Sequence, residues 1–244
     1  MEPAEYRKMA AVEDGMWYYR ALHAHVGREL TAHCGGWAAK ILDAGCGTGG
    51  LIRRLTATEP AWRWSGVDVE PLACALARER CAGEIREASV TALPFAVGEF
   101  DAVVSADVLY HVDDDAAALW EAHRVLRPGG MLVVNVPAYR WLWSYHDAAT
   151  QARRRYGRGE AMAKLRAAGF GPVRATHWNA LLLPLVALRR KLLPAPAGGS
   201  DVQHYPPAVE WVCNLAMAGE SAWLRRVGRL PFGTSILAVA QKTG

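Results

Sequence analysis

Short runs of β-branched residues alternate with helical stretches from residue 40 onward, and this alternation constrains the fold more than any other feature of the sequence. The runs KILDAG, WRWSGVDV and EIREA are separated by two stretches where a helix is expected, at 51–58 and 71–81. That order is typical of a βαβαβ unit, in which crossover helices join parallel strands. The later runs FDAVVSA and MLVVNVP continue the pattern, so the sequence predicts a doubly wound α/β fold around a mostly parallel sheet.

The length of the chain limits how many domains it can form. The chain has 244 residues, of which 52% are apolar and 21% are charged. This length is sufficient to bury one substantial core but is short for two full domains. The longest apolar run near the C-terminus, at 180–188, is shorter than the ~20 residues that span a bilayer. We therefore expect a single domain with no transmembrane segment, and we see no signal peptide at the N-terminus.

The cysteines and the acidic clusters do not have the spacing of metal ligands. The five cysteines are odd in number and lack CxxC pairs, which indicates neither a disulfide framework nor a zinc site. The acidic run Asp113–Asp115 is better explained as the start of a helix, where carboxylates are favourable. We therefore predict a cytoplasmic protein that requires no metal.

Charge is distributed unevenly along the chain. Residues 1–138 hold 13 basic and 19 acidic side chains, whereas residues 139–244 hold 15 basic and 5 acidic ones. The C-terminal part, with a net charge of +10, is suited to an acidic substrate, an anionic lipid or a phosphate. A solvated basic face without a ligand explains the same counts, so both interpretations stay open.

A glycine-rich segment, Asp43–Gly50, follows the first expected strand and opens the first helix. Glycines let the backbone turn sharply and approach a ligand closely. The next strand ends at Asp68, about 20 residues downstream, where a carboxylate can accept hydrogen bonds from the ribose hydroxyls of a nucleoside. No GxxxxGK[ST] sequence follows the strand, which argues against a triphosphate cradle. Dinucleotide-binding domains use a similar glycine turn, so this segment alone does not settle the ligand.

Five landmarks occur in order between residues 38 and 137: LDAGCGTG, GVDVEP, LPF followed by FD, DVLYHVDD and RVLRPGG. Segment by segment they resemble the class I S-adenosylmethionine-dependent methyltransferase family. More loosely, MWYYR, VPAYRWLWSYHD and LPFGTSILAVAQK look like a bacterial subgroup that acts on small molecules. The resemblance implies a seven-stranded, mostly parallel sheet and S-adenosyl-L-methionine as cofactor.

The resemblance also implies roles for single residues in binding that cofactor. Gly45, Gly47 and their neighbours would hold its methionine portion, and Asp43 would reach the amino group. Asp68 would bind the ribose, while Ser89 stands where many relatives have an aspartate that binds adenine, and a hydroxyl accepts that bond more weakly. The full set of predicted cofactor-binding residues is Asp43, Gly45, Cys46, Gly47, Asp68, Val69, Ser89, Val90, Ala106, Tyr19 and Arg20.

The chain divides into four parts on this interpretation. The aromatic helix around Tyr19 could fold over the cofactor as a lid and place aromatic faces against the sulfonium, although ordinary helix packing is as good an explanation. A helical insertion is expected before the last strand. The parts are an N-terminal helical cap at 1–37, a cofactor-binding core at 38–137, substrate-side segments with the insertion at 138–230, and the last strand at 231–244.

Three residues are candidates for acid–base catalysis because they follow strands at the carboxyl edge of the sheet, where open α/β sheets bind ligands. His111 comes after the fourth strand, and a histidine at a helix start that only bonds backbone is the alternative. His146 and Asp147 come after the fifth strand and could form a base with its orienting carboxylate, or could be two packing groups in a loop.

The segments beside this edge supply candidates for binding the methyl acceptor. The arginines at 153–155 could clamp a carboxylate or phosphate through paired guanidinium hydrogen bonds, although a solvated helix face is the simpler interpretation. Aromatic residues nearby could form the wall of a pocket. The predicted acceptor-binding residues are Tyr110, Tyr139, Trp143, Arg154, Arg155 and Tyr156.

The sequence thus predicts transfer of a methyl group to oxygen or nitrogen of a small organic molecule, such as a secondary metabolite or a sugar, that is acidic or hydrophobic. Two alternatives remain: an RNA methyltransferase, and a non-catalytic protein that binds S-adenosylmethionine. No nucleic-acid partner is expected, because no Pro-Pro sequence follows the fourth strand and no RNA-binding module is appended. We expect a monomer or homodimer, and the apolar and basic run at 180–191 could contact a membrane surface peripherally.

Overall fold

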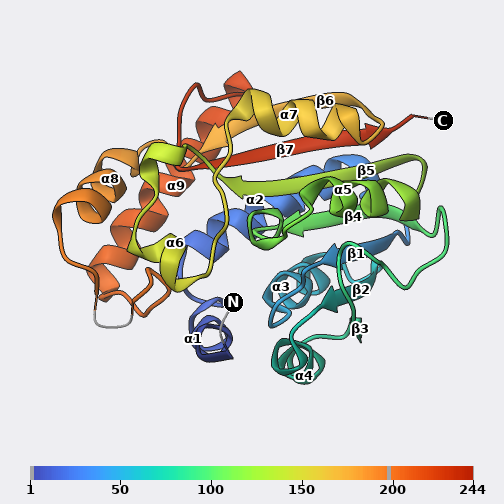
Figure 1. Ribbon diagram of the computed structural model, residues 1–244, viewed down its shortest axis with the longest axis horizontal. Coiled ribbons are helices and arrows are strands. Elements are labelled where there is room, and N and C mark those ends of the chain that lie inside the picture. The colour runs from blue at the N-terminus through green and yellow to red at the C-terminus, as the bar shows by residue number, and fades with distance from the viewer. Residues whose placement is uncertain (1–2, 197–198, 244) are drawn as a thin grey trace.

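The computed structural model describes residues 3–196 and 199–243. Within them lies a seven-stranded sheet in the order β3-β2-β1-β4-β5-β7-β6 (Figure 1). Strands β1 to β5 are parallel neighbours, and β7 runs antiparallel between β5 and β6. The strands are β1 (Lys40–Ala44), β2 (Arg63–Asp68), β3 (Glu84–Glu87), β4 (Phe100–Ala106), β5 (Leu126–Pro137), β6 (Phe170–Trp178) and β7 (Ser235–Lys242).

Helices cover both faces of this sheet because consecutive residues of its strands are apolar and point to opposite sides. In β1, Ile41 joins the core formed with α2, α3, α4 and α9, whereas Leu42 joins the core formed with α5 and α7. The helices are α1 (Pro3–Val12), α2 (Trp17–Cys34), α3 (Gly50–Thr58), α4 (Pro71–Arg80), α5 (Asp115–Val125), α6 (Tyr145–Ala149), α7 (Arg158–Ala167), α8 (Leu183–Leu192) and α9 (Pro207–Val227), with 3₁₀ turns η1 (Leu109–His111) and η2 (Arg140–Leu142).

The predicted α/β class and the seven-stranded, mostly parallel sheet are confirmed. The two helices expected between the first three strands are α3 and α4. The acidic run before α5 also does what was predicted, since Oδ1 of Asp114 accepts a hydrogen bond from the backbone N–H of Ala117 at 2.9 Å and caps the helix. The helical insertion before the last strand consists of α8 and α9.

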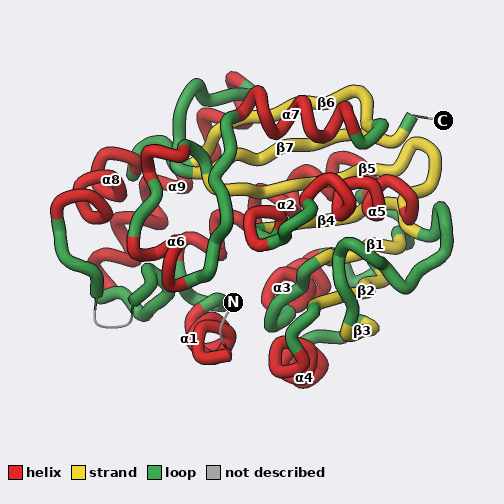
Figure 2. Tube along the Cα trace, viewed as in Figure 1, coloured by secondary structure: helices red, strands yellow, loops and turns green. Residues whose placement is uncertain are grey.

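Three helices, α6, α8 and α9, lie beyond the ends at which β4 and β5 finish, on the left in Figure 1, and α1 lies below them. Figure 2 shows that the segments joining them are mostly loops, so this edge of the sheet carries the irregular part of the chain. The edge is the one where parallel strands end and where open α/β sheets bind ligands.

The two helices of the N-terminal cap, residues 1–37, pack against different parts of the molecule. Helix α2 lies on the sheet, and the buried residues Val26 and Leu30 of its middle belong to the core. Its N-terminal part, from Tyr18 and Tyr19 to His23, lines the cavity at the carboxyl edge of the strands. The part of the cap that covers the glycine-rich loop is therefore α1, together with the start of α2. No helix in the described part of the chain is long and apolar enough to cross a membrane.

Candidate functional site

The glycine-rich loop between β1 and α3 has a backbone that side chains would disrupt. Gly45 and Gly47 have φ angles of +94° and +52°, in the region that glycine tolerates without strain. A Cβ atom added to Gly45 would lie 2.2 Å from Cγ2 of Val108, and one added to Gly47 would lie 2.7 Å from Cε of Met9. The loop therefore presents bare backbone at this position, as a turn that approaches a ligand closely must do.

Asp68 ends β2 beside that loop and is buried. Its Oδ2 accepts a hydrogen bond from the N–H of Gly47 at 3.0 Å, and its Oδ1 accepts one from the N–H of Glu70 at 3.0 Å. The Tyr6 hydroxyl donates to Oδ1 at 3.3 Å. Burial raises the pKa of Asp68, while the two amides and the tyrosine hydroxyl partly oppose that effect. The carboxylate is thus fixed in place by the loop that it helps to shape.

A second buried carboxyl group, Asp43, lies close to the first. Burial raises the pKa of Asp43 to about 8, and the charge of Asp68 adds to this effect. Two neighbouring carboxyl groups disfavour ionisation of both, so a cationic group bound beside them would be stabilised. The bare glycine backbone and Asp43 fit the methionine portion of S-adenosylmethionine, which carries an ammonium, and Asp68 lies beside them at the end of β2, where the ribose is expected.

Both carboxyl groups line a cavity of about 1060 Å³ that runs from the glycine loop to α8 and α9. Sites for small ligands typically enclose roughly 300–1,000 Å³, so this cavity has room for a nucleoside cofactor and a second small molecule. All but one of the predicted cofactor-binding residues line it: Asp43, Gly45, Cys46, Gly47, Asp68, Val69, Ser89, Val90, Ala106 and Tyr19.

The exception is Arg20, which is exposed on α2 and does not line the cavity. The prediction for Arg20 is corrected, because neighbouring helical residues point about 100° apart and Tyr19 is the one that faces inward. Ser89 remains at the position where adenine is expected. Its hydroxyl lies 2.8 Å from Oγ1 of Thr91 and accepts a hydrogen bond from the Thr91 N–H at 3.2 Å, so it is already engaged in a local turn.

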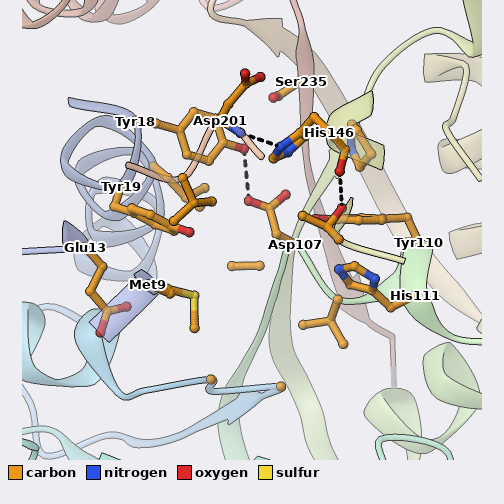
Figure 3. Close-up of a pocket in the computed structure, with 18 of the residues that line it drawn as sticks. Met9, Glu13, Tyr18, Tyr19, Asp107, Tyr110, His111, His146, Asp201 and Ser235 are labelled. Atoms are coloured by element: carbon orange, nitrogen blue, oxygen red, sulfur yellow. Dashed lines mark hydrogen bonds between the residues drawn. The ribbon is translucent and has the colours of Figure 1, made fainter. Parts of the chain in front are cut away.

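Asp107 lies in the middle of the cavity, between the tyrosines of α2 and the residues of η1 (Figure 3). It follows β4 directly, with a φ of +59°. The Tyr18 hydroxyl donates to Oδ2 at 2.9 Å, and Nδ2 of Asn135 donates to Oδ1 at 2.8 Å. Burial raises the pKa of Asp107 to about 6, although both hydrogen bonds favour its ionised form. This side chain is therefore a carboxyl group that changes its protonation near neutral pH.

Asp107, Asn135 and Tyr18 were not among the single residues predicted from the sequence to form the site. Asn135 comes from the neighbouring strand β5, and its amide orientation is fixed because Oδ1 accepts a hydrogen bond from Nε1 of Trp178 at 2.7 Å. The sequence does contain a feature that points to Asp107 as a site residue, because Asp107 is the first residue of the DVLYHVDD landmark and follows an apolar strand. Nothing local to Asn135 or Tyr18 indicates that both would bond to it.

Helix α1 and the turn that follows it supply three lining residues that were not predicted from the sequence: Tyr6, Met9 and Glu13. Figure 3 shows Met9 and Glu13 on the same side of the cavity as Tyr19. The Glu13 carboxylate accepts hydrogen bonds from Thr48 of the glycine loop region and from Arg80 of α4, which fasten α1 over the loop. Spacings of three and four residues direct these side chains to the same side of a helix. This spacing is the feature of the sequence from which a shared lining position could have been predicted.

The predicted candidate His111 lines the cavity at the end of η1. Its Nδ1 is 3.5 Å from the backbone oxygen of Gln151, and its Nε2 is buried without a hydrogen-bond partner among the described residues. Burial lowers the pKa of His111 to about 4, so the ring is neutral near pH 7. Its catalytic role stays a prediction, which the unpartnered nitrogen supports.

His146 and Asp147 do not form the predicted base and orienting carboxylate. Nδ1 of His146 accepts a hydrogen bond from the N–H of Asp201 at 3.1 Å, and burial lowers the pKa of the imidazole to about 4. Asp147 instead caps α6 by accepting from the N–H of Ser144 at 2.8 Å, and it binds Nε of Arg155 at 2.7 Å. Because neighbouring helical residues diverge, the two side chains reach different partners.

The predicted arginine clamp is also corrected. Arg155 is buried and committed to Asp147 and to the backbone oxygen of Ala138 at 3.0 Å. Arg154 does not line the cavity, and its guanidinium pairs with Asp115 at 3.3 Å. Both guanidinium groups therefore fasten the segment after α6 to the sheet and to α5, which leaves neither free to bind an acceptor.

Of the four aromatic residues that were predicted to bind the acceptor, Tyr110 alone lines the cavity. Tyr156 is buried in the core with α5 and α7. Tyr139 stacks on His177 with ring centroids 5.4 Å apart, and Trp143 is partly exposed with its backbone oxygen bonded to a lysine of α8. None of the three lines the cavity, so their prediction as acceptor-binding residues is corrected. Tyr139 and Trp143 flank the 3₁₀ turn η2, and the Tyr156 hydroxyl donates to Oδ2 of Asp115 at 2.7 Å.

The fold, with a cavity at the carboxyl ends of its strands, is that of class I methyltransferases. Across 98% of the chain, the structure resembles a S-adenosylmethionine-dependent enzyme of Thermotoga maritima described as a possible histamine N-methyltransferase, covering 96% of that chain with a TM-score of 0.62 and 18% identity. Identity this low shows the fold alone. Among the described residues, no group of three or more His, Cys, Asp or Glu is arranged to hold a metal ion.

The sequence relationship is confined to the core. Residues 42–134 match the family described as methyltransferase domain. The chain is 34% identical over 128 residues to malonyl-[acyl-carrier protein] O-methyltransferase of Enterobacter lignolyticus, covering 48% of each protein. It is 42% identical over 100 residues to demethylmenaquinone methyltransferase of Thermus thermophilus, covering 39% of this chain and 46% of the relative. The chain thus spans about half the length of these relatives, and the resemblance to class I methyltransferases is confirmed for its core.

Proposed function

We propose that the protein is a S-adenosylmethionine-dependent methyltransferase that methylates an oxygen or nitrogen atom of a small organic molecule. The observation that carries the proposal is one continuous cavity, with the glycine loop, Asp43 and Asp68 at one end and Asp107 in its middle. The names of two relatives, malonyl-[acyl-carrier protein] O-methyltransferase and demethylmenaquinone methyltransferase, support the same general class of reaction.

S-adenosylmethionine, when bound, supplies an activated methyl group whose departure leaves a neutral thioether. Because the leaving group is already good, the protein mainly positions the acceptor and excludes water. Tyr18, Tyr19 and Tyr110 surround Asp107 and would keep water out of this part of the cavity. Oδ1 or Oδ2 of Asp107 would take the proton that a hydroxyl or ammonium acceptor loses.

Asp107 is a better candidate for the base than either histidine. A general base is most effective when its pKa lies near the working pH. The pKa of Asp107 is raised to about 6, whereas burial lowers the pKa of His111 and of His146 to about 4. His111 is then suited to accept a hydrogen bond through Nε2 and orient the acceptor.

The lining of the cavity favours an apolar acceptor over an acidic one. Three of the four arginines that line it, Arg153, Arg155 and Arg190, are paired with carboxylates. The fourth, Arg189, donates to the backbone oxygen of Pro194 at 2.6 Å. The rest of the far wall is aliphatic and comes from the insertion, with Leu182, Leu185, Val186, Val202 and Val209. The same pairing leaves few free cations inside the cavity to bind a phosphate.

Calorimetric titration with S-adenosylmethionine and S-adenosylhomocysteine tests the cofactor assignment. Asp68→Ala should weaken binding by roughly 10- to 100-fold, because hydrogen bonds to a charged group contribute about 1.5–3 kcal/mol. Glu79→Ala, which changes an exposed carboxylate of the neighbouring helix α4, is the matched control and should bind like the unaltered protein. Failure of the unaltered protein to bind either compound would overturn the proposal.

The acceptor is then sought with radiolabelled S-adenosylmethionine and a panel of malonyl-[acyl-carrier protein], demethylmenaquinone, histamine and total RNA. Label in a small molecule supports the proposal, label in RNA supports the alternative reaction, and binding without turnover on any acceptor supports a non-catalytic protein. A cytoplasmic location, independence from metal and a monomeric or dimeric state stay predictions. Light scattering on the purified protein measures the last of these.

A further inference from the structure

Helix α9 presents an apolar stripe to solvent along its length. Trp211 and Leu215 are 67% and 58% exposed, and Val212 and Trp223 are exposed as well. Spacings of four and eight residues place Trp211, Leu215 and Trp223 on one side of the helix, opposite the buried side chains with which α9 packs on the core. A helix of 21 residues is about 31 Å long. Exposed apolar surface of this extent marks a contact with another molecule or with lipid.

Helix α8 adds a second apolar stripe, and both stripes adjoin the cavity. Leu185, Leu188 and Leu192 are exposed at spacings of three and four residues on α8. Leu185 of α8 and Val209 of α9 also line the cavity, although they are 57% and 39% exposed. The aliphatic wall of the cavity therefore continues into the exposed surface. Both helices lie at the left end of the molecule in Figure 1.

The charges on this surface are of one sign. Arg225, Arg226 and Arg229 are exposed at the C-terminal end of α9. The three acidic residues between 179 and 232 are all engaged within the protein: Asp201 pairs with Arg190, Glu210 accepts from the N–H of Trp17, and Glu220 accepts from the N–H of Ala180. The surface thus combines apolar stripes with cations, and the described residues of 179–232 include no carboxylate without a partner.

We propose that α8 and α9 dock the protein onto the surface of an anionic lipid membrane. Tryptophan and arginine suit the interface between lipid tails and phosphates, where an amphipathic helix lies flat. A second copy of the chain would present the same cations and no carboxylates to pair with them, which disfavours a symmetric dimer. Docking would bring the cavity to the lipid, so an acceptor with an apolar tail would enter from the membrane. That consequence rests on the proposed function, whereas docking does not.

Vesicle flotation measures the docking directly. The unaltered protein should float with vesicles of phosphatidylcholine and phosphatidylglycerol, and should bind phosphatidylcholine alone more weakly. High salt should release it, since salt screens charges at the membrane surface. The double variant Trp211→Ser/Leu215→Ser should lower the partition coefficient by about tenfold on the anionic vesicles, because it removes apolar area from the stripe. Arg225→Glu/Arg226→Glu should remove the preference for anionic lipid.

Matched controls change equally exposed residues elsewhere. Trp120→Ser/Val97→Ser alters exposed apolar residues on α5 and in the loop before β4, and Arg63→Glu alters an exposed cation at the start of β2. Both controls should float like the unaltered protein. The proposal is wrong if the unaltered protein does not float, if the controls lose binding equally, or if light scattering shows a dimer that Trp211→Ser/Leu215→Ser disperses. Titration of every variant with S-adenosylmethionine reports the cofactor site independently of lipid.

Discussion

Replacing Asp107 with asparagine is expected to lower kcat for methyl transfer by about 100-fold or more, the usual contribution of a general base. Asparagine keeps the size of the side chain and can still bond to Tyr18, but it cannot take a proton. Because the effect is on the chemical step, the Kd for S-adenosylmethionine should change little. The measurement is steady-state kinetics with the acceptor that the panel identifies, next to a calorimetric titration with the cofactor.

The pH dependence provides a second readout for the same residue. Asp107 acts as a base only when ionised, and burial raises its pKa to about 6, so activity should rise with pH through that value and then level off. Tyr18→Phe removes a hydrogen bond that favours the ionised form, so the rise should move to higher pH. A profile that rises near pH 4 and is insensitive to Tyr18→Phe would assign the base to a histidine instead.

Replacing Arg155 with methionine is expected to lower the free energy of unfolding by about 3–5 kcal/mol, the usual cost of removing one partner of a buried ion pair. Arg155 and Asp147 are each 2% exposed, and methionine would leave the aspartate charge buried without its partner. Chemical denaturation followed by circular dichroism measures the change. A loss of this size would indicate that Asp147 stabilises the folded protein, in place of the catalytic role predicted from the sequence.

The double variant Arg155→Met/Asp147→Asn separates charge from packing. Asparagine removes the stranded charge and can still cap α6, so the double variant should recover much of the lost stability. Arg53→Met is the matched control, because Arg53 and its partner Asp14 are about half exposed, and a surface pair contributes less than about 1 kcal/mol. An equal loss in both single variants would contradict the assignment of Arg155 and Asp147 as a buried structural pair.

The sequence placed residues at the cavity where one short segment determines its own conformation. The glycine loop is such a segment, because Gly45 and Gly47 have positive φ angles that glycine adopts without strain. Asp68 is another, since it ends a strand at a fixed distance from that loop and bonds to Gly47 within it. These positions line the cavity as expected.

Predictions failed where a role depends on the direction of a side chain relative to distant parts of the chain. His146 and Asp147 are adjacent in sequence, yet one accepts from Asp201 and the other from Arg155, because consecutive helical residues diverge. The arginines after α6 were expected to face an acceptor, but carboxylates of α5 and α6 hold two of them. Sequence alone gives no means to pair charges across such separations.

The sequence by itself determined the doubly wound sheet and the cofactor end of the cavity, since hydrophobic periodicity and glycine backbone geometry are local properties. Only the tertiary structure decided the acceptor end, because Asp107 acquires its partners from α2 and β5, which are far apart in the chain. It also decided that α8 and α9 pack one face on the core and leave the other apolar face in solvent. Both outcomes depend on which surfaces meet when the chain folds, and no short segment encodes that.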